Sequence, residues 1–489
     1  MSSSKARSSH TEMYESLLSV PENDEKFESL HRVEAVYDPL PERRDGLIVS
    51  NRQYRQQYAN LYYLRLATLK PILSAHAERK WASIKIAGQK PRLVMNTLNV
   101  KQGEVVWIIG TCFMDLPLKP NILEDVAKDH LHVAIPPREK YVGLDGGEVV
   151  MLEDESGRIR LVGGRLLEEG LVTGCVIAVL GSENGEGTFE VVDVCLPGMA
   201  PQKEVEVDEN GEDEWIAVVS GLGLTGHEHE NLQTHLLAEY LTGELGTNED
   251  QLQARKISRV IFAGNSVDAL AKPSPTDEDE STVRKNKKYG YDASAYNPLP
   301  TAAFDDLVTD LASSITVDVM PGPLDPAIAT LPQQPLHVAM FPQVRAYSGS
   351  TFNAVTNPYW CSIGGNTFFG SSGQTIDDIY KYELPTDLGD KLTMMERTLR
   401  WRHSAPTAPD TLWCYPFQDR DPFIMEETPR VYYLGNQDSF DTREVEGEDG
   451  QKVRLVSVPR FKERSELVLV NLKTLECEVV VFDVEGQVA

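Results

Sequence analysis

Three short segments carry polar residues on which a hydrolytic metal centre could be built. They read Val219-Ser220-Gly221-Leu222, Gly264-Asn265-Ser266-Val267-Asp268 and Leu434-Gly435-Asn436-Gln437-Asp438. One known arrangement of a two-metal hydrolytic centre has Asp-x-His in the first segment, Gly-Asp-x-x-Asp in the second and Gly-His-x-His in the third. Several carboxylate and imidazole ligands are required because the two cations lie about 3.5–4 Å apart.

Most of these ligands are missing from the chain. The first segment has no ligand, the second keeps one carboxylate, and the third has no histidine. The altered positions are Ser220, Leu222, Asn265, Asp268, Asn436 and Asp438. Asp268 could be a remnant ligand, or it could hydrogen-bond the turn that it terminates. With no ligand at 220–222 the second role is favoured, and we expect no catalytic, metal-binding or cofactor-binding residue here.

Gly221-Leu222-Gly223-Leu224-Thr225-Gly226 matches the G-x-G-x-x-G pattern of dinucleotide-binding proteins. It follows an expected strand and precedes an expected helix. The next strand, however, ends near Gly264-Asn265 and is not closed by an acidic residue that could bind a ribose. We therefore favour a tight strand-to-helix turn, in which glycines relieve backbone crowding.

The histidines do not form a recognisable ligand set. His227 and His229 are two residues apart and cannot share one helical face, although a loop could bring them together. A solvated helix start is the favoured interpretation. A residually active metallophosphoesterase would have to use unconventional ligands, for example His227, His229, Asp268 and His403.

Composition points to protein partners. The chain has 489 residues with 47 Lys and Arg against 75 Asp and Glu, a formal net charge of −28. Such a charge repels phosphate backbones unless basic residues are segregated, so strong direct DNA binding is disfavoured. The six cysteines form no C-x-x-C pair, and no run of 18 apolar residues is present. We expect no membrane association and a reducing compartment.

The chain is expected to begin with an irregular segment, 1–45, followed by a helix and an OB-fold domain over 46–200. Tyr54, Tyr58, Leu61, Tyr62, Leu66 and Leu69 lie on one helical face, and Pro71 should bend or restart that helix. Five short strands then fit a small barrel: 105–113, 149–152, 159–162, 172–180 and 189–195. Residues 91–196 contain 9 Lys and Arg and 17 Asp and Glu. This balance suits protein docking better than a single-stranded nucleic acid.

The second half is expected to alternate strands and helices. Residues 201–214 form an acidic linker, and 215–489 an α/β sandwich. Strands are predicted at 215–219, 260–263, 315–319, 431–434 and 455–458, and helices at 230–241 and 305–313. The Pro-, Lys- and acid-rich stretch 272–288 should be a mobile loop. Whether this loop or the Ser-rich residues 1–12 are modified stays open.

Several longer stretches together resemble the B-subunits of replicative DNA polymerases, and most of all the polymerase delta branch. The most specific are Leu331–His337, Gly370–Ile379 and Arg402–Leu412, and the resemblance covers the chain from about residue 35. It implies an OB-fold barrel packed on a calcineurin-like phosphoesterase domain whose active site is degenerate. Pro323 belongs to Pro321–Asp325, which stands where active relatives carry Gly-Asn-His-Glu.

The resemblance also implies a function. B-subunits are non-catalytic nuclear scaffolds for DNA replication and repair synthesis. The delta member grips the cysteine-rich C-terminal domain of the catalytic subunit and binds a third subunit, which reaches the sliding clamp. Any metal or iron–sulfur centre would then belong to the catalytic partner. The equivalent subunit of polymerase alpha or epsilon remains an alternative.

Overall fold

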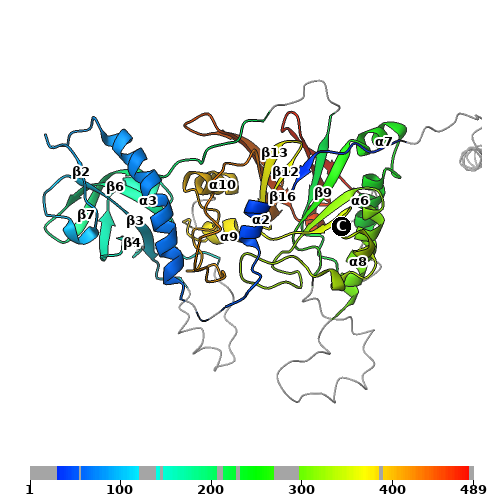
Figure 1. The fold of residues 1–489 in the computed structure, drawn as a ribbon, viewed down its shortest axis with the longest axis horizontal. Coiled ribbons are helices and arrows are strands. Elements are labelled where there is room, and N and C mark those ends of the chain that lie inside the picture. The colour runs from blue at the N-terminus through cyan, green and yellow to red at the C-terminus, as the bar shows by residue number, and fades with distance from the viewer. Residues whose placement is uncertain are drawn as a thin grey trace, which may run out of the picture. The chain divides into compact units, whose positions relative to one another are not determined.

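The computed structural model describes residues 30–53, 55, 57–86, 88–119, 139–143, 147–205, 213–226, 232–268, 297–384 and 389–483. The chain divides into two compact units, Met1–His31 and Arg32–Ala489, and the fold below is that of the second (Figure 1). Among the described residues, no helix has the length and apolar character needed to cross a membrane.

The first part of this unit is a barrel with a long helix against it. Its strands are β2 (Arg92–Leu93), β3 (Val106–Asp115), β4 (Val149–Glu153), β5 (Arg158–Val162), β6 (Val176–Glu183) and β7 (Thr188–Cys195). They pair in the order β2-β3-β4-β5-β7-β6, and a further β3–β6 pairing closes the barrel. The helix α3 (Ala59–Trp81) packs on the barrel through Leu66, Leu69, Leu73, Ala77 and Trp81. Two short helical segments, η1 (Thr97–Asn99) and α5 (Arg165–Glu168), complete this part.

The rest of the unit contains two six-stranded sheets. Sheet I has the order β1 (Tyr37–Asp38), β12 (Tyr359–Ile363), β13 (Asn366–Ser371), β14 (Val431–Gln437), β16 (Lys452–Pro459) and β15 (Asp441–Glu446). Sheet II has the order β11 (Phe352–Ala354), β10 (Thr316–Met320), β9 (Ile257–Ala263), β8 (Trp215–Val219), β17 (Glu466–Asn471) and β18 (Cys477–Val481). Because central strands are covered on both faces, β8 and β9 are buried along their whole length, which explains the apolar sequence of β8 and of Val260–Ala263 in β9.

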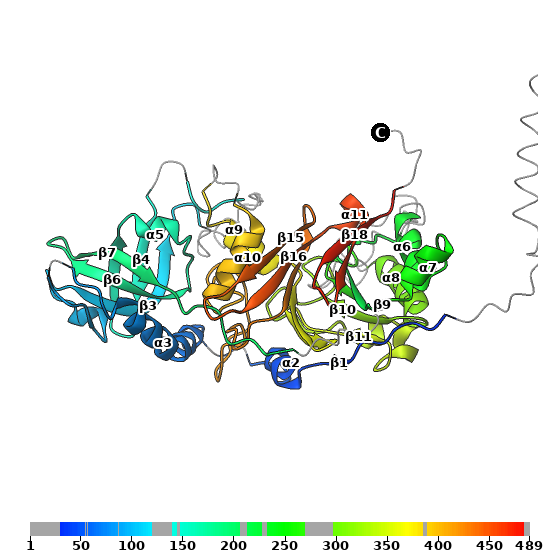
Figure 2. The ribbon, with the colours of Figure 1, turned by 90° about the horizontal axis from the view of Figure 1, so that it is seen from above.

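The two sheets pack face to face, and helices cover their outer faces. Ile216, Val218 and Ile261 of sheet II meet Tyr359, Phe368 and Tyr433 of sheet I in the core between the sheets. The outer face of sheet II is covered by α6 (Leu232–Thr242) and α8 (Leu299–Ala312), beside α7 (Asn248–Ala254). On the outer face of sheet I lie α9 (Gln374–Tyr380) and α10 (Lys391–Arg400). Figure 2 shows these layers, with the barrel beyond α9 and α10. The remaining short helices are η4 (Val338–Met340), η5 (Val344–Tyr347) and α11 (Phe461–Arg464).

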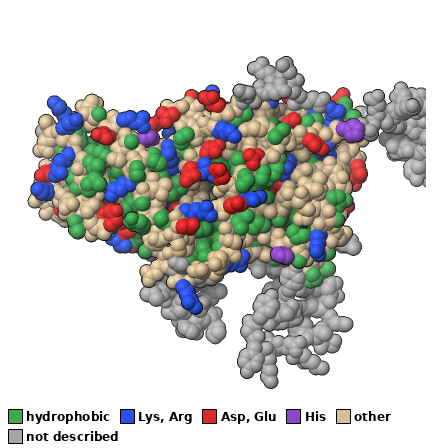
Figure 3. All heavy atoms as spheres, viewed as in Figure 1, with side chains coloured by type: hydrophobic (Ala, Val, Ile, Leu, Met, Phe, Trp, Pro, Cys, Tyr) green, Lys and Arg blue, Asp and Glu red, His purple; other side chains and the backbone are tan. Residues whose placement is uncertain are grey.

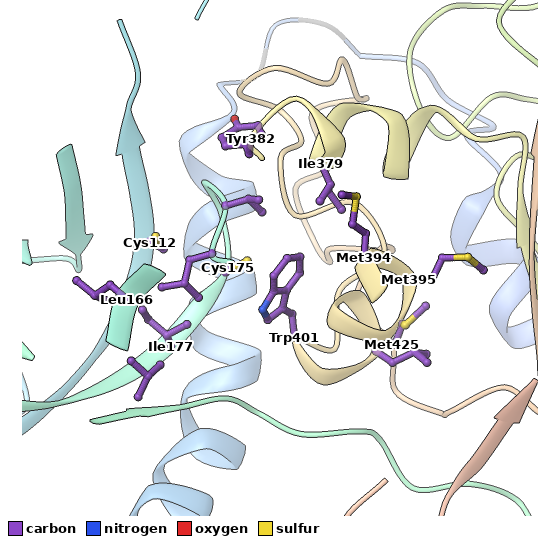
Figure 4. Packing of buried hydrophobic residues seen from close by; sticks show 14 of the residues in the cluster. Cys112, Leu166, Cys175, Ile177, Ile379, Tyr382, Met394, Met395, Trp401 and Met425 are labelled. Atoms are coloured by element: carbon purple, nitrogen blue, oxygen red, sulfur yellow. The ribbon is translucent and has the colours of Figure 1, made fainter. Parts of the chain in front are cut away.

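The barrel and the sheets share one apolar core. Cys112, Cys175 and Ile177 of the barrel belong to the same buried cluster as Met394 of α10 and Trp401, which follows α10. Trp401 is fully buried and lies between the barrel strands and the helical layer (Figure 4). The barrel is therefore part of the same packed body as the two sheets.

An N-terminal strap, residues 32–47, crosses the sheets before the chain enters α3. The Arg32 guanidinium donates to four carbonyl oxygens, those of Leu241, Ala254, Ile257 and Ser314, at 2.6–3.0 Å. Burial lowers the pKa of Arg32 to about 10. Further on, β1 pairs with β12, and α2 (Pro41–Leu47) follows. The strap thus links the C-terminal ends of α6, α7 and α8 and the start of β9 to strand β12 of sheet I.

The structure agrees with most predicted elements and differs at three places. Helix α3 runs continuously through Pro71, so a restart there was wrong; packing on the barrel on both sides of Pro71 holds the helix together. Residues 172–175 precede β6 and form a turn. Residues 37–47 form β1 and α2, although the irregular segment was predicted to reach residue 45. The loop 272–288, Tyr54 and residues 1–12 lie outside the described residues.

The junction between barrel and sheets gives a testable prediction. Gly174 and Gly187 both have positive φ, 94° and 76°, but a Cβ at Gly174 would overlap the carbonyl oxygen of Pro406, whereas nothing lies within 4 Å at Gly187. We expect Gly174→Ala to lower the free energy of unfolding by roughly 3 kcal/mol or more. The control Gly187→Ala should cost roughly 1 kcal/mol from backbone strain alone. Urea unfolding measures both, and equal losses would contradict this account of the junction.

Candidate functional site

The three polar segments meet at one edge of the two sheets, in what we call the cradle: residues 220–222, 263–268, 322–325, 371–374 and 435–437. The Gly221 amide donates to the Gly264 carbonyl at 2.9 Å. The backbone N–H of Asn436 donates to the Ser220 hydroxyl at 2.8 Å, and its side-chain amide donates to the carbonyls of Ala263 and Ser372. Sequence-distant loops are therefore joined here by hydrogen bonds between neutral groups.

The other predicted positions have individual surroundings. The Ser220 hydroxyl donates toward the Val458 and Pro459 carbonyls, and Leu222 is buried in the core beneath α6 and α8. The side-chain oxygen Oδ1 of Asn265 accepts the Leu324 amide at 2.9 Å, while Pro323 is exposed. The backbone amide of Asp268 donates to the Leu224 carbonyl. Asp438 lies on the surface and pairs with Arg460 at 2.6 Å.

A buried network of amide side chains lies beside these loops. The Asn357 amide nitrogen donates to Gln333, Ser372 and Gln374 at 2.7–3.0 Å, and its oxygen accepts the Ser372 backbone amide. Gln333 in turn donates to the carbonyls of Gly322 and Ile328, and Gln374 donates to Gln333. Such a network satisfies its own donors and acceptors without a buried charge, which stabilises the loops that it joins.

Asp325 is the buried carboxylate nearest to these loops. Its oxygens accept the backbone amides of Val267 and Gly322 at 2.9 and 2.7 Å. Burial raises the pKa of Asp325 to about 7, and these backbone hydrogen bonds act in the opposite direction. The side chain thus ties the β9 loop to the β10 loop. No group of three or more His, Cys, Asp or Glu side chains suited to a metal ion occurs among the described residues.

A second polar cluster lies away from the cradle, where α3 meets the loop 403–421. Arg65 and Asp421 are fully buried and paired at 2.8 Å. The Arg65 guanidinium also donates to the carbonyls of Gly174, Pro406 and Ala408. His403 joins the cluster, with Nε2 2.9 Å from the same Asp421 oxygen and Nδ1 accepting the Ala405 amide. The Arg65 guanidinium therefore links α3 to the barrel and to the two-sheet body.

The charge states follow from these contacts. Burial lowers the pKa of His403 to about 4, and the positive charge of Arg65 adds to this effect, so the imidazole is neutral at pH 7. Burial would raise the pKa of Asp421, but the positive charge of Arg65 and the hydrogen bonds from Arg65 and His403 hold it well below its usual range. Because Nδ1 accepts the Ala405 amide, the His403 proton is on Nε2 and is donated to Asp421. Both ring nitrogens of His403 are thus occupied within the protein.

The structure brings some of the candidate residues together in the cradle, places His403 elsewhere, and does not describe His227 and His229. The cradle brings Ser220, Asn265 and Asn436 together, whereas His403 contacts none of them and belongs to the Arg65 cluster. His227 and His229 lie outside the described residues. The glycine-rich turn at 221–226 has positive φ at all three of its glycines, as expected for a tight strand-to-helix connection.

Sequence reasoning missed Asn357, Gln333, Gln374 and Arg65. Neutral amides have no characteristic spacing, and a single buried arginine in an aromatic helix face resembles a surface charge. The only available signal was the position of Arg65 between Tyr62 and Leu66, on a stripe predicted to be core.

Two family models match the chain. Residues 216–442 match the B subunit of DNA polymerase alpha/epsilon, and residues 57–194 match the DNA polymerase delta subunit OB-fold domain. The closed barrel with α3 thus coincides with the OB-fold match, and most of the two-sheet body with the B-subunit match.

Full-length relatives specify the branch. The chain is 37% identical to the DNA polymerase delta small subunit of Oryza sativa subsp. japonica, with 93% of this chain and 99% of that protein covered. It is 38% identical to the DNA polymerase delta small subunit of Arabidopsis thaliana, with 94% of this chain and 98% of that protein covered. It is 34% identical to the DNA polymerase delta small subunit of Saccharomyces cerevisiae, with 93% of this chain and 95% of that protein covered. The chain belongs to the DNA polymerase delta small subunit family.

The amide network predicts sensitivity to a single charge. Asn357→Asp keeps the shape of the side chain but places a carboxylate against the oxygens of Gln333, Ser372 and Gln374, so we expect a loss of roughly 3–5 kcal/mol in unfolding free energy. Asn184→Asp is the matched control, because the Asn184 side chain acts through its oxygen, which accepts the amides of Glu186 and Thr188. The control should change stability by less than about 0.5 kcal/mol. Denaturant unfolding at pH 7.5 tests this, and a tolerant Asn357→Asp would refute the closed neutral network.

His403 predicts a pH dependence. The unfolded chain takes up a proton on this imidazole near the ordinary histidine pKa of 6.5, whereas the folded chain takes it up only near pH 4. Acidification through this window therefore favours the unfolded state, by up to roughly 3 kcal/mol at its lower end. Asp421 contributes to the pH dependence of stability only at lower pH. Its pKa is lower in the folded chain, so its contribution to stability is lost as the pH falls below the pKa of this carboxyl group in the unfolded chain.

We expect His403→Gln to be less stable than the wild type at pH 7.5 but to lose less stability between pH 6.5 and 4.5. Thermal unfolding as a function of pH measures both slopes. Parallel slopes for the two proteins would show that His403 titrates normally in the folded state.

Proposed function

We propose that this chain is a non-catalytic accessory subunit of the DNA polymerase delta complex, which acts in DNA replication and repair synthesis in the nucleus. It bridges the C-terminal domain of the catalytic subunit and a third subunit, and contacts the sliding clamp only indirectly. The observation that carries the non-catalytic part is the cradle: neutral Ser and Asn side chains stand where the resemblance would place metal ligands, and a network of amide side chains lies beside them. A two-metal hydrolysis needs bridging anionic ligands that these groups cannot supply.

We also propose that the two-sheet body is a calcineurin-like phosphoesterase fold that has lost its chemistry, with boundaries near 215–489, and that 46–200 is its OB-fold partner domain. The order of two mixed sheets covered by helices supports this, as does the convergence of strand-ending loops at one edge. A ligand site at strand ends is the usual arrangement in α/β sheets.

Surface charge supports protein contacts over DNA contacts. The net charge is −28, and on the face in Figure 3 acidic and basic side chains are interspersed. A groove for single-stranded DNA would combine a run of unpaired cations with exposed aromatic rings. On the barrel, Arg158 and Lys119 lie over the Phe113 ring but are already paired with Glu153 and Asp410.

The proposal is tested by purifying the tagged chain from its native cells at moderate salt and identifying its partners by mass spectrometry. We expect stoichiometric recovery of the polymerase delta catalytic subunit and a third subunit. Recovery of the alpha or epsilon catalytic subunit would correct the assignment, and a chain recovered alone would refute the subunit function.

A separate assay tests the lost chemistry. The purified chain should contain no stoichiometric Mn, Zn or Fe and should not hydrolyse a phosphodiester with added Mn²⁺. Activity that disappears in Asp268→Asn would instead establish a residual phosphoesterase.

A further inference from the structure

Exposed apolar side chains gather on one face of the barrel, along α3. Tyr63 of α3 is 57% exposed, Met95 59% and Leu98 74%. The contacts among their neighbours place them on one continuous surface. Lys70 of α3 lies against the Met95 carbonyl at 3.5 Å and against Glu155 at 3.8 Å, and the Leu98 amide donates to the Ser156 hydroxyl. We call this surface, Tyr63, Met95, Leu98 and the turn 153–157, the α3 face.

A cavity of about 330 Å³ opens in the α3 face. Its walls are Ala59, Tyr62, Tyr63 and Leu66 of α3, Thr111 of β3, and residues 153–155 of the β4–β5 turn. One side is therefore apolar and aromatic, and the other carries carboxylates. A cavity of this composition suits a long side chain with an apolar stem and a cationic end, because the stem can lie along the rings and the charge can reach the carboxylates.

The acidic wall is fixed in position, and although burial opposes this effect, hydrogen bonds from Ser156 and Thr97 lower the pKa of Asp154, so this carboxylate is charged. The Asp154 carboxylate accepts the backbone amides of Thr97, Ser156 and Gly157, which holds the turn rigid. Glu153 is half-buried; burial raises its pKa, and Asp410 adds to this effect although Arg158 opposes it. Glu155 is 51% exposed at the rim, where Lys70 approaches it no closer than 3.8 Å. A rigid wall costs a ligand little ordering entropy.

We propose that the α3 face is a docking surface for a segment of another polymerase subunit that carries an apolar anchor and a neighbouring lysine or arginine. The anchor covers Tyr63, Met95 and Leu98, and the basic side chain enters the cavity toward Glu155 and the charged Asp154, since Glu153 is already paired with Arg158. The chemistry of the surface selects this occupant: a hydrophobic patch with an acidic wall repels an acidic segment and attracts a basic one. This inference rests on the proposed function, since it requires partner subunits.

The test uses the complex reconstituted from this chain, the catalytic subunit and the third subunit. Hydrogen exchange should show protection of residues 58–70 and 93–99 in the complex relative to the free chain. Tyr63→Ser and Glu155→Lys should each speed dissociation of the subunit that covers the face, by about tenfold or more for Tyr63→Ser. The effect of Glu155→Lys should shrink as salt is raised, because it acts through charge.

Matched controls lie elsewhere on the barrel. Val192→Ser removes an apolar side chain that is 48% exposed, and Glu186→Lys reverses an exposed charge on the β6–β7 hairpin. Neither should change dissociation. A complex that forms normally but leaves 58–70 and 93–99 unprotected, with wild-type dissociation in both variants, would overturn this inference while leaving the proposed function intact. Failure of any complex to assemble would instead refute the proposed function.

Discussion

The body of this protein depends on a single buried guanidinium. Arg65 has no exposed surface, and it binds the Asp421 carboxylate together with three carbonyls, that of Gly174 beside the barrel and those of Pro406 and Ala408 in the loop 403–421. Removing one partner of a buried ion pair typically costs about 3–5 kcal/mol, because the remaining charge is left without solvent or counterion. The planar fork of arginine satisfies several acceptors at fixed angles, which a lysine could not do. These contacts give the barrel a defined orientation on the sheets. The shared apolar core around Trp401 packs between the barrel and the sheets.

The cradle holds loops from both sheets together mainly through neutral groups. Asn265 and Asn436 have left-handed backbones, with φ of 54° and 60°. The loops converge because Ser220, Asn436 and the network around Asn357 hold them with hydrogen bonds. Asp325 adds a buried carboxylate, whose oxygens accept two backbone amides. Neutral amides can bridge the loops at this depth without the large desolvation cost of further buried charges.

Sequence reasoning located the regular elements well because their signals are local. The apolar runs of β8 and β14 and the periodicity of α3 identify strands and a helix without knowledge of their partners. It failed at Pro71, where packing outweighs a local helix breaker. The positions in the cradle could be named because a metal centre has a known spacing. Asn357, Gln333 and Arg65 could not, since a buried polar contact is set by the three-dimensional approach of distant segments.

The N-terminal strap has a consequence for how the chain is made. Tyr37 contacts Tyr359, which lies 322 positions further along the chain, and Arg32 binds carbonyls up to 282 positions away. At typical translation speeds of about 5–20 residues per second, roughly 15–65 seconds pass between the synthesis of Tyr37 and that of its partner. The strap leaves the ribosome before these partners have been synthesised, so it stays unpaired until they follow. During this interval β1 is an extended segment without its partner strand β12, and a chaperone would have to protect it.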